Sequence, residues 1–299
     1  MDGLKHVVVA GGSGLVGRAL VAALAGAGVR VTVLSRTPRA AGLPAGAEAR
    51  GWDDLPAALE GADAVINLCG ESIAGARWSP ARKQLLVDSR VGPTGRLVQA
   101  MAGRGVLVNA SAVGIYGALD GRPVDEAQAP GKGFLAQVCR KWEAAADGAA
   151  GARVVKLRLG VVLARDGGAL PKMALPVRLF QGTRLGHGQQ GLSWIHLDDL
   201  VRMLVEAAAN PAWQGPVNAV APMPVTNETF TRALARRLHR PLLPVPAWIT
   251  RAALRLLLGE MGQAMLLEGA FVYPRKAEAL GFEFRFPGVE AALADLLPG

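Results

Sequence analysis

The stretch VVVAGGSGLVGRAL, residues 7–20, limits what this 299-residue chain can fold into more than any other part of it. A short β-branched run leads directly into a glycine-rich loop, and an amphipathic helical pattern follows. The glycines fit two overlapping spacings, from Gly11 or Gly12 through Gly14 to Gly17. Small residues there let the backbone approach a pyrophosphate at the positive end of a helix, and Gly17 lets that helix pack closely on the strand. The stretch therefore predicts the strand, loop and helix of a dinucleotide-binding unit.

β-branched runs alternate with amphipathic stretches through the first half of the chain. The runs are HVVVA (6–10), VRVTVL (29–34), AVINL (64–68), VLVNA (106–110) and RVVKLRL (153–159). This rhythm is typical of a parallel sheet with helices on both faces. We therefore predict an α/β fold with a Rossmann-type doubly wound parallel sheet, whose ligands bind beyond the carboxyl ends of the strands.

The alternation loosens after residue 160, where glycine and proline interrupt the chain. Residues 167–176 and 182–191 are interpreted as long loops near a pocket. SWIHLDDLVRMLVEAAAN predicts a strand and a helix, PVNAVAP another strand, and TNETFTRALARRLHR a helix capped by Thr or Asn. We predict a nucleotide-binding core in residues 1–165 with contributions from about 192–222. A smaller C-terminal α/β lobe for substrate would then comprise residues 166–191 and 223–299.

Composition narrows the classes of function. The chain is 51% hydrophobic but holds no uninterrupted apolar run of the roughly 18 residues that a membrane span needs, so we expect no membrane partner. It opens with MDGLKHVVVAGG, which leaves no room for a signal peptide and predicts a cytoplasmic location. Cys69 and Cys139 have neither a CxxC partner nor a histidine at ligand spacing, so we expect reduced thiols, no metal site and no disulfide.

The net charge of +9 comes from 33 lysines and arginines. These residues are mostly dispersed, and aromatic residues make up only 5% of the chain, whereas nucleic-acid-binding surfaces cluster their basic residues and add aromatic ones. We therefore expect a small-molecule substrate and no nucleic acid partner.

The end of the second strand run, in VTVLSRTPR, indicates which dinucleotide binds. An NAD enzyme would place Asp or Glu there to bind the ribose 2′-hydroxyl. This chain has Ser35 and Arg36. A guanidinium takes a 2′-phosphate in a charge-assisted pair and the serine adds a hydroxyl donor, so the sequence predicts NADP as the cofactor. The alternative is an arginine that points into solvent.

Five motifs together resemble an extended short-chain dehydrogenase/reductase of the NAD-dependent epimerase/dehydratase superfamily. They are AGGSGLVG, VINLCGE, SAVGIYG, LRLGVVL and SWIHLDDLV. The segments GARWSPAR (75–82), DSR (88–90), FLAQVCRKWEAA and GEMGQAMLLEGAFVYPRKAEALGFEFRFP (259–287) are similar to an atypical, YfcH-like branch that carries a C-terminal domain of unknown function. The resemblance covers essentially the whole chain.

The resemblance implies a set of cofactor contacts at the carboxyl edge of the sheet. It implies pyrophosphate contacts at Gly11, Gly12, Ser13, Gly14, Leu15 and Val16, and 2′-phosphate contacts at Ser35 and Arg36. It also implies nucleotide contacts at Leu68, Cys69, Gly70 and Arg90, and contacts on the nicotinamide side near Val161 and Val162. A homodimer through helices that flank the active site is implied as well.

The chain departs from the family at the catalytic pair. Typical relatives use Ser, Tyr and Lys, where the lysine lowers the tyrosine pKa so that the phenol can exchange a proton during hydride transfer. Counted back from Glu143, the tyrosine position holds Leu135 and the lysine position holds Cys139. Ser111 is retained in NASAVGIYG and Tyr116 follows five residues later, so these two are the candidate catalytic residues.

Three interpretations remain open from the sequence. In the first, the chain is an NADP(H)-dependent oxidoreductase of the epimerase/dehydratase type with an unknown carbonyl or sugar-like substrate, and Tyr116, His187 or His196 replaces the missing acid. In the second, it is a catalytically silent NADPH-binding sensor or regulator. In the third, it is an epimerase that uses unconventional groups. We favour the first, with Tyr116 as the proton carrier.

Overall fold

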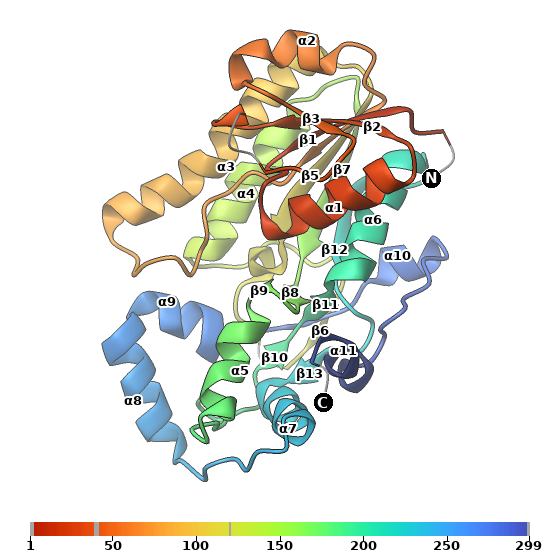
Figure 1. The fold of residues 1–299 in the computed structure, drawn as a ribbon. Coiled ribbons are helices and arrows are strands. Elements are labelled where there is room, and N and C mark those ends of the chain that lie inside the picture. Colours follow the sequence, from red (N-terminus) through yellow and green to blue (C-terminus); the bar gives the residue numbers. More distant parts are fainter. Residues whose placement is uncertain (1–2, 39–41, 120, 298–299) are drawn as a thin grey trace.

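The computed structural model describes residues 3–38, 42–119 and 121–297. Residues 1–2, at the start of the predicted core, lie outside the described residues. So do residues 298–299, at the end of the predicted lobe. Figure 1 shows a sheet with helices on both sides and, below it in this view, a smaller lobe built mainly from the later part of the chain.

Seven parallel strands form the central sheet in the order β12, β7, β5, β4, β1, β2, β3. They are β1 (His6–Ala10), β2 (Arg30–Leu34), β3 (Ala47–Arg50), β4 (Ala64–Asn67), β5 (Val106–Ala112), β7 (Arg153–Leu159) and β12 (Gly215–Ala219). The strand order reverses between β1 and β4, and a crevice for ligands opens at such a point. The predicted fold class and strand runs are confirmed. The sequence of β3, AEAR, has no β-branched residue, and the pattern does not predict this strand.

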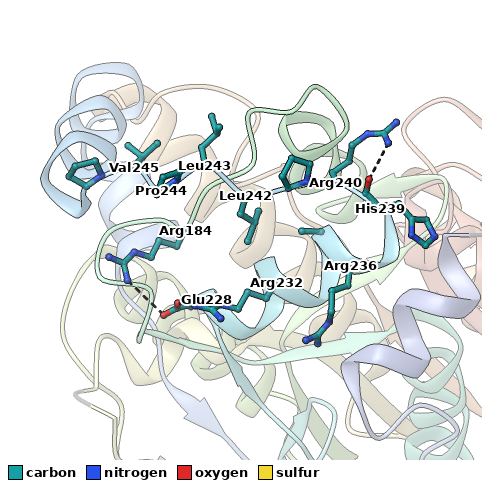
Figure 2. Close-up of a pocket in the computed structure, with 13 residues that line it drawn as sticks. Arg184, Glu228, Arg232, Arg236, His239, Arg240, Leu242, Leu243, Pro244 and Val245 are labelled. Carbon is teal, nitrogen blue, oxygen red and sulfur yellow. Dashed lines mark hydrogen bonds and ion pairs between the residues drawn. The ribbon is translucent and has the colours of Figure 1, made fainter.

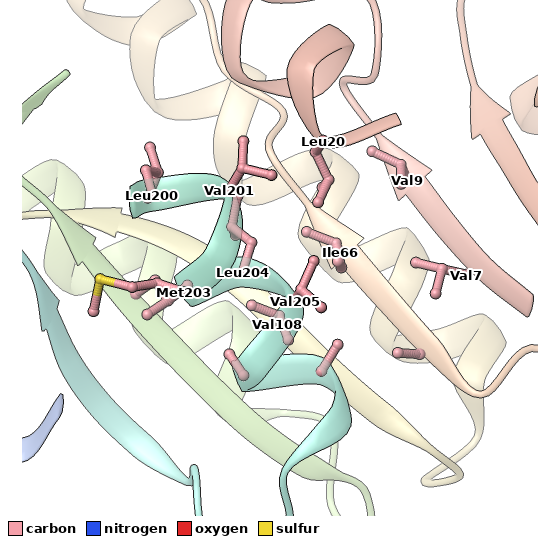
Figure 3. Packing of buried hydrophobic residues seen from close by; sticks show 14 of the residues in the cluster. Val7, Val9, Leu20, Ile66, Val108, Leu200, Val201, Met203, Leu204 and Val205 are labelled. Carbon is pink, nitrogen blue, oxygen red and sulfur yellow. The ribbon is translucent and has the colours of Figure 1, made fainter. Parts of the chain in front are cut away.

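Helices cover both faces of this sheet. α1 (Leu15–Gly26) and α6 (Leu197–Ala209) pack on one face, while α2 (Leu55–Leu59), α3 (Pro80–Met101) and α4 (Phe134–Asp147) pack on the other. Figure 3 shows the first layer, in which Leu204 of α6, Leu20 of α1 and Ile66 of β4 belong to one fully buried cluster. This packing fixes the beginning of α1 at the carboxyl edge of the sheet.

The lobe has short strands and helices around a second core. Its strands are β6 (Pro123–Val124), β8 (Val161–Ala164), β9 (Gly167–Gly168), β10 (Gly191–Leu192), β11 (Trp194–His196), β13 (Val225–Thr226) and β14 (Phe271–Val272). Its helices are α5 (Leu170–Arg178), α7 (Asn227–Arg237), α8 (Ala247–Leu258), α9 (Glu260–Gly262), α10 (Arg275–Ala279) and α11 (Val289–Leu296). Trp194, Phe230 and Leu293 lie in the centre of this second core. Thr226 accepts a hydrogen bond from the Thr229 N–H, which confirms the predicted cap of α7.

The prediction of a long loop over residues 167–176 is wrong, because α5 occupies most of this segment. Pro171 falls in the first turn of the helix, where a missing N–H costs nothing. Leu170, Ala174 and Val177 share one face and are buried in the lobe core. The burial of this face outweighs the second proline, Pro176, which the pattern treats as a helix breaker.

The last part of the chain packs against both cores. Ala277 of α10 joins the core of the large sheet, and Phe282 lies edge-on to Trp213 with 6.0 Å between the ring centroids. β14 pairs with β6 in parallel. Among the residues that the structure describes, none of the helices combines the length and hydrophobicity that crossing a membrane requires.

Replacing Gly17 by Ala should destabilise the protein, because a Cβ atom built there lies 2.3 Å from the Gly11 carbonyl oxygen and 2.6 Å from Gly12 Cα. Backbone atoms cannot yield as a flexible side chain does, so we expect a loss of about 1–3 kcal/mol in the free energy of unfolding, measured in urea. Gly26→Ala, in the last turn of the same helix, is the control. A Cβ there meets no atom within 4 Å, so stability should stay unchanged or rise by up to about 1 kcal/mol. Equal losses in both variants would contradict the packing argument.

Candidate functional site

The glycine loop between β1 and α1 forms an open cradle at the carboxyl edge of the sheet. Gly11 has a φ of 81°, and a Cβ atom there would lie 2.8 Å from the Leu68 carbonyl oxygen. A Cβ at Gly12 would lie 2.7 Å from the Val33 side chain. The N-cap of α1 is Gly14, which has no side chain to accept from the first N–H groups of this helix. These donors and the positive end of the helix dipole suit a pyrophosphate.

The residues after β2 lie where the sequence predicts recognition of the 2′-phosphate. The Arg36 side chain is 87% exposed, and its Nη2 lies 3.9 Å from Glu71 Oε1. Ser35 Oγ accepts from the Thr37 N–H at 3.1 Å. Among the residues that the structure describes, Glu71 is the one carboxylate near Arg36, and the guanidinium is largely exposed to solvent.

The loop after β4 lies directly against the glycine loop. Arg90 of α3 is buried, and its guanidinium donates to the Leu86 and Glu71 carbonyl oxygens at 2.9 and 3.0 Å. It stacks over Trp142 and lies so close to Gly70 that a Cβ there would be 3.0 Å from Arg90 Cζ. Arg90 thus positions the loop that carries Leu68, Cys69 and Gly70, all implied cofactor contacts.

Val161 and Val162, the implied contacts on the nicotinamide side, are half-buried in β8 just beyond the carboxyl end of β7. The hairpin of β8 and β9 folds back over the glycine loop, and a Cβ at Gly168 would lie 2.9 Å from Leu15 Cδ2. Residues of the loop, the hairpin and the segment after β4 are therefore neighbours at the carboxyl edge of the sheet. Ser13 and Val16, on the same loop and helix, are exposed and half-buried.

A buried ionic network lies at the end of β5. Ser111 Oγ donates to Glu143 Oε1 at 2.7 Å. Arg158 of β7 donates from Nε to Glu143 Oε1 at 2.9 Å and from Nη2 to Glu143 Oε2 at 3.0 Å. Glu143 and Arg158 are 7% and 6% exposed. Two buried, fully paired charges of this kind hold α4 against the sheet and fix the direction of the Ser111 hydroxyl.

Tyr116, the expected proton carrier, is buried in the structure. It lies in the short 3₁₀ turn Val113–Tyr116 and is 1% exposed. Its hydroxyl donates to Asn218 Oδ1 at 2.7 Å and accepts from Arg158 Nη1 at 2.9 Å. Burial raises the pKa of Tyr116 despite the nearby guanidinium. Both of its hydrogen bonds are used inside the protein, so the phenol holds its proton.

Leu135 and Cys139 replace the usual tyrosine and lysine on α4. Leu135 packs on the turn after β5, where a Cβ at Gly114 would lie 3.3 Å from Leu135 Cβ. Cys139 is buried, and burial together with the Glu143 charge raises its pKa to about 11. The position opposite the crevice is therefore apolar, and the thiol beside it is protonated at neutral pH.

The two histidines that the sequence offers as substitutes differ in position. His196 is buried, its Nδ1 accepts from the Asp198 N–H, and its ring stacks on Phe286 at 3.9 Å between centroids. This is a helix cap and a packing residue. His187 is exposed in the loop before β10, where its Nδ1 accepts from the Gln189 N–H at 3.0 Å. Its neighbour Gly188 lies against Glu228 of α7, away from the glycine loop.

Sequence reasoning overlooked the network of Arg158 and Glu143, although a signal for it was present. RVVKLRL predicts a buried strand, and an arginine in such a strand needs a carboxylate partner. The same holds for Asn67 in AVIN, whose amide donates to Thr94 Oγ1 at 2.8 Å and to Asn109 Oδ1 at 2.7 Å. Polar residues in apolar strand runs were the indication of both buried networks.

A groove of about 950 Å³ lies in the lobe, between α7 and the proline-rich connection that leads to α8 (Figure 2). Its basic side chains are Arg184, Arg232, Arg236, His239 and Arg240. Glu228 pairs with Arg232 at 2.7 Å and lies 3.9 Å from Arg184. The groove is formed by the lobe alone, and none of the predicted cofactor contacts lines it. It is therefore distinct from the crevice at the edge of the sheet.

Two family models match this chain. The model of the NAD dependent epimerase/dehydratase family matches residues 7–220, which include the glycine loop and all of the large sheet except its first residue, His6. The chain belongs to this family. A second model, a domain of unknown function (DUF1731), matches residues 245–296. The resemblance to a branch of the epimerase/dehydratase superfamily with a C-terminal domain of unknown function is confirmed.

Relatives in this family match over nearly the full chain. An epimerase family protein of Mycobacterium bovis is 46% identical over 296 residues, 96% of this chain and 96% of its own. A chloroplastic SDR39U1 homologue of Arabidopsis thaliana is 41% identical and covers 97% of this chain and 86% of its own. The crystal structure of human epimerase family protein SDR39U1 with NADPH gives a TM-score of 0.87 at 34% identity, covering 98% and 99% of the two chains. A cytoplasmic location stays a prediction.

Both cysteine thiols should resist alkylation in the native protein. Burial raises the pKa of Cys69 to about 12, and that of Cys139 lies at about 11, whereas a free thiol titrates near 8.5. Because the thiolate is the reactive form, we expect labelling at pH 8 to be at least a hundredfold slower than in guanidinium chloride. The rate should rise with pH up to the raised values. Single Cys→Ala variants show which of the two cysteines is labelled. Rapid alkylation of either thiol at pH 7 would contradict the raised pKa values.

Proposed function

We propose that this protein is an NADP(H)-dependent oxidoreductase of the epimerase/dehydratase type, with a small carbonyl or sugar-like substrate. The observation that carries the proposal is the exposed guanidinium of Arg36, placed after β2 beside an open glycine cradle. A carboxylate at this point would repel a 2′-phosphate, whereas Arg36 attracts it. The human relative crystallised with NADPH supports the same choice.

The residues present fit a nicotinamide dinucleotide. Side chains at Gly11 and Gly12 would fill the cradle or displace its walls, and the uncapped start of α1 offers donors to a pyrophosphate. Leu68, Cys69 and Gly70 form the next wall, held in place by Arg90. When bound, the nicotinamide supplies hydride transfer to or from the substrate. In this proposal the protein binds the cofactor along this edge, with Val161 and Val162 against its nicotinamide side.

We infer that water supplies the proton to the substrate oxygen when hydride is added, and takes it up when hydride is removed. The hydroxyl groups of Tyr116 and Ser111 both donate hydrogen bonds to buried acceptors, Asn218 and Glu143 respectively. Leu135 has no proton to give, and the thiol of Cys139 has a raised pKa. In this proposal Ser111 and Tyr116 are positioning residues that hold α4 and the turn after β5.

The alternative is a catalytically silent NADPH-binding sensor or regulator. One observation favours it: an apolar side chain and a buried thiol, Leu135 and Cys139, occupy the positions of the usual catalytic pair. A protein that only binds the cofactor needs the glycine cradle and Arg36 but no proton carrier. The two functions differ in whether any carbonyl compound oxidises NADPH in the presence of the protein.

Arg36→Asp should weaken NADPH binding about tenfold to a hundredfold and leave NADH binding nearly unchanged, because the change removes a phosphate partner and adds a repelling charge. Isothermal titration with both cofactors measures the two affinities. Arg104→Asp, an exposed arginine after α3, is the matched control and should alter neither. Equal losses for NADPH and NADH in the Arg36 variant would remove the basis for NADP selectivity.

Tyr116→Phe should keep at least a third of the turnover of any substrate found by following NADPH oxidation against a panel of carbonyl compounds. The phenol is sealed from the crevice, so the change should instead lower stability, by about 1–3 kcal/mol for the unpaired Asn218 and Arg158 groups. Urea unfolding and steady-state kinetics on the same sample separate the two effects. Loss of more than 95% of turnover with intact folding would restore Tyr116 as the proton carrier. A panel without any turnover, with NADPH bound, would favour the sensor.

A further inference from the structure

The segment GARWSPAR, residues 75–82, brings a second arginine to the carboxylate that faces Arg36. Ser79 caps α3 by accepting from the Arg82 N–H at 3.1 Å, so the Arg82 side chain leaves the first turn of this helix. Its Nη2 donates to the Ser72 carbonyl oxygen at 2.6 Å, and the side chain is only 16% exposed. Arg82 is therefore fixed between its helix and the loop that follows β4.

Glu71 lies between the two arginines. Its Oε1 is 3.9 Å from Arg36 Nη2, and its Oε2 is 3.7 Å from Arg82 Nη1. Both distances exceed the roughly 2.7–2.9 Å of a charge-assisted hydrogen bond, so the carboxylate is shared between the arginines and held tightly by neither. Its backbone is fixed, because the Glu71 N–H donates to Ser89 Oγ at 3.1 Å and its carbonyl oxygen accepts from Arg90 at 3.0 Å.

The two arginines differ in what else they can bind. Arg36 is 87% exposed and stands where a 2′-phosphate is expected, whereas Arg82 is largely covered by protein. Arg82 Nε is buried and has no hydrogen-bond partner among the residues that the structure describes. A carboxylate that leaves Arg36 can therefore be kept by Arg82. A shift of less than about 1 Å would bring the Glu71 carboxylate within hydrogen-bond distance of Arg82 Nη1.

We propose that Glu71 and Arg82 tune the preference for NADP(H), because Arg82 takes over the Glu71 carboxylate when a 2′-phosphate binds Arg36. This inference rests on the NADP selectivity of the proposed function. The phosphate and the carboxylate carry like charges and compete for one guanidinium, so Glu71 opposes the binding of NADP(H). Arg82 reduces this opposition by neutralising the carboxylate. The 2′-hydroxyl of NAD(H) carries no charge and does not compete for Arg36.

Arg82 is in this proposal a positioning residue, which acts through Glu71 without contacting the cofactor. Two other roles of Glu71 lead to different results. If its carboxylate held Arg36 ready for the phosphate, its removal would weaken the binding of NADPH. If it accepted from a ribose hydroxyl, its removal would weaken NADPH and NADH alike. The gap of 3.9 Å to Arg36 speaks against the first role, since a carboxylate that orients a guanidinium hydrogen-bonds to it.

Titration calorimetry of the full chain with NADPH, NADH, 2′,5′-ADP and 5′-AMP tests the proposal. Glu71→Gln should tighten the binding of NADPH and 2′,5′-ADP at least about threefold, because these two ligands carry the 2′-phosphate. The affinities for NADH and 5′-AMP should stay within about twofold. Glu290→Gln is the matched control: it removes a carboxylate that lies 3.4 Å from Arg236 in the lobe and should change none of the four affinities.

Arg82→Gln should weaken NADPH binding about threefold to tenfold and leave NADH binding within about twofold. Arg82→Lys keeps the charge and should keep the affinity of the wild type for NADPH. In the Glu71→Gln background, Arg82→Gln should alter NADPH binding less than about twofold, since no carboxylate is left to neutralise. Unfolding in urea, together with the unchanged NADH affinity, verifies that the loop after β4 is intact.

The outcomes separate this inference from the function on which it rests. Equal affinity of the wild type for NADPH and NADH would remove the NADP selectivity itself, and this inference with it. If the wild type prefers NADPH and Arg36→Asp abolishes that preference, three results would each overturn the role of Glu71 and Arg82 alone. They are unchanged or weaker NADPH binding in Glu71→Gln, equal losses of NADPH and NADH binding in Arg82→Gln, and the same loss from Arg82→Gln with and without Glu71→Gln.

Discussion

The close contact between Gly17 and the backbone of Gly11 and Gly12 is the constraint on which the site depends. It brings the first turn of α1 against the end of β1, so that the start of the helix points into the crevice between β1 and β4. Any side chain at Gly17 would separate helix and strand and move the positive end of the helix away from a bound anion. The core around Leu20 and Leu204 then holds α1 in that position from its other end.

The family's catalytic pair is missing, yet the positions around it are firmly held. A side chain on α4 that carries a proton to the substrate must be accessible to the substrate and must have a shifted pKa. Here the carboxylate of Glu143 is committed to Arg158 and Ser111, and Cys139 is sealed beside it. At the position of the family's tyrosine, Leu135 presents an apolar side chain that packs against Gly114 in the turn after β5. An apolar side chain cannot transfer a proton, so in the proposed function the protein acts by positioning the reactants.

The sequence predicted those features that local patterns encode, and it failed where distant residues meet. β-branched runs identified the strands of the large sheet except β3, whose residues AEAR carry no such signal. The glycine spacing located the cradle, because Gly17 must be small to pack against Gly11 and Gly12, which lie only a few residues before it. The sequence could not show that Tyr116 is buried, since its partner Asn218 lies 102 residues away, and its catalytic role stays a prediction. The prolines of residues 167–176 led us to predict a loop where the structure has α5. The helix forms because Leu170 and Val177 are buried in the lobe core, which the local sequence does not show. The cofactor contacts themselves stay predictions that the geometry of the cradle supports.

The position of Tyr116 also explains how the C-terminal domain of unknown function is attached to the sheet. Asn218 of β12 accepts from the Tyr116 hydroxyl and donates to the Tyr273 carbonyl oxygen at 3.0 Å. Glu126 accepts from the Asn218 N–H at 2.9 Å and lies 3.3 Å from the Lys276 N–H.

The surface pair of Lys83 and Glu260 is partly exposed and contributes little to this attachment, because exposed ion pairs are screened by water. Buried contacts hold the junction instead. Ser193 Oγ donates to the Ala270 carbonyl oxygen and accepts from the Val272 N–H. Hydrogen bonds thus run without interruption from Ser111 at the end of β5, through the buried ion pair, Tyr116 and Asn218, to Tyr273, which follows β14 within the last domain. The tyrosine that the sequence assigns to proton transfer is a joint between the nucleotide-binding sheet and the domain that completes the lobe.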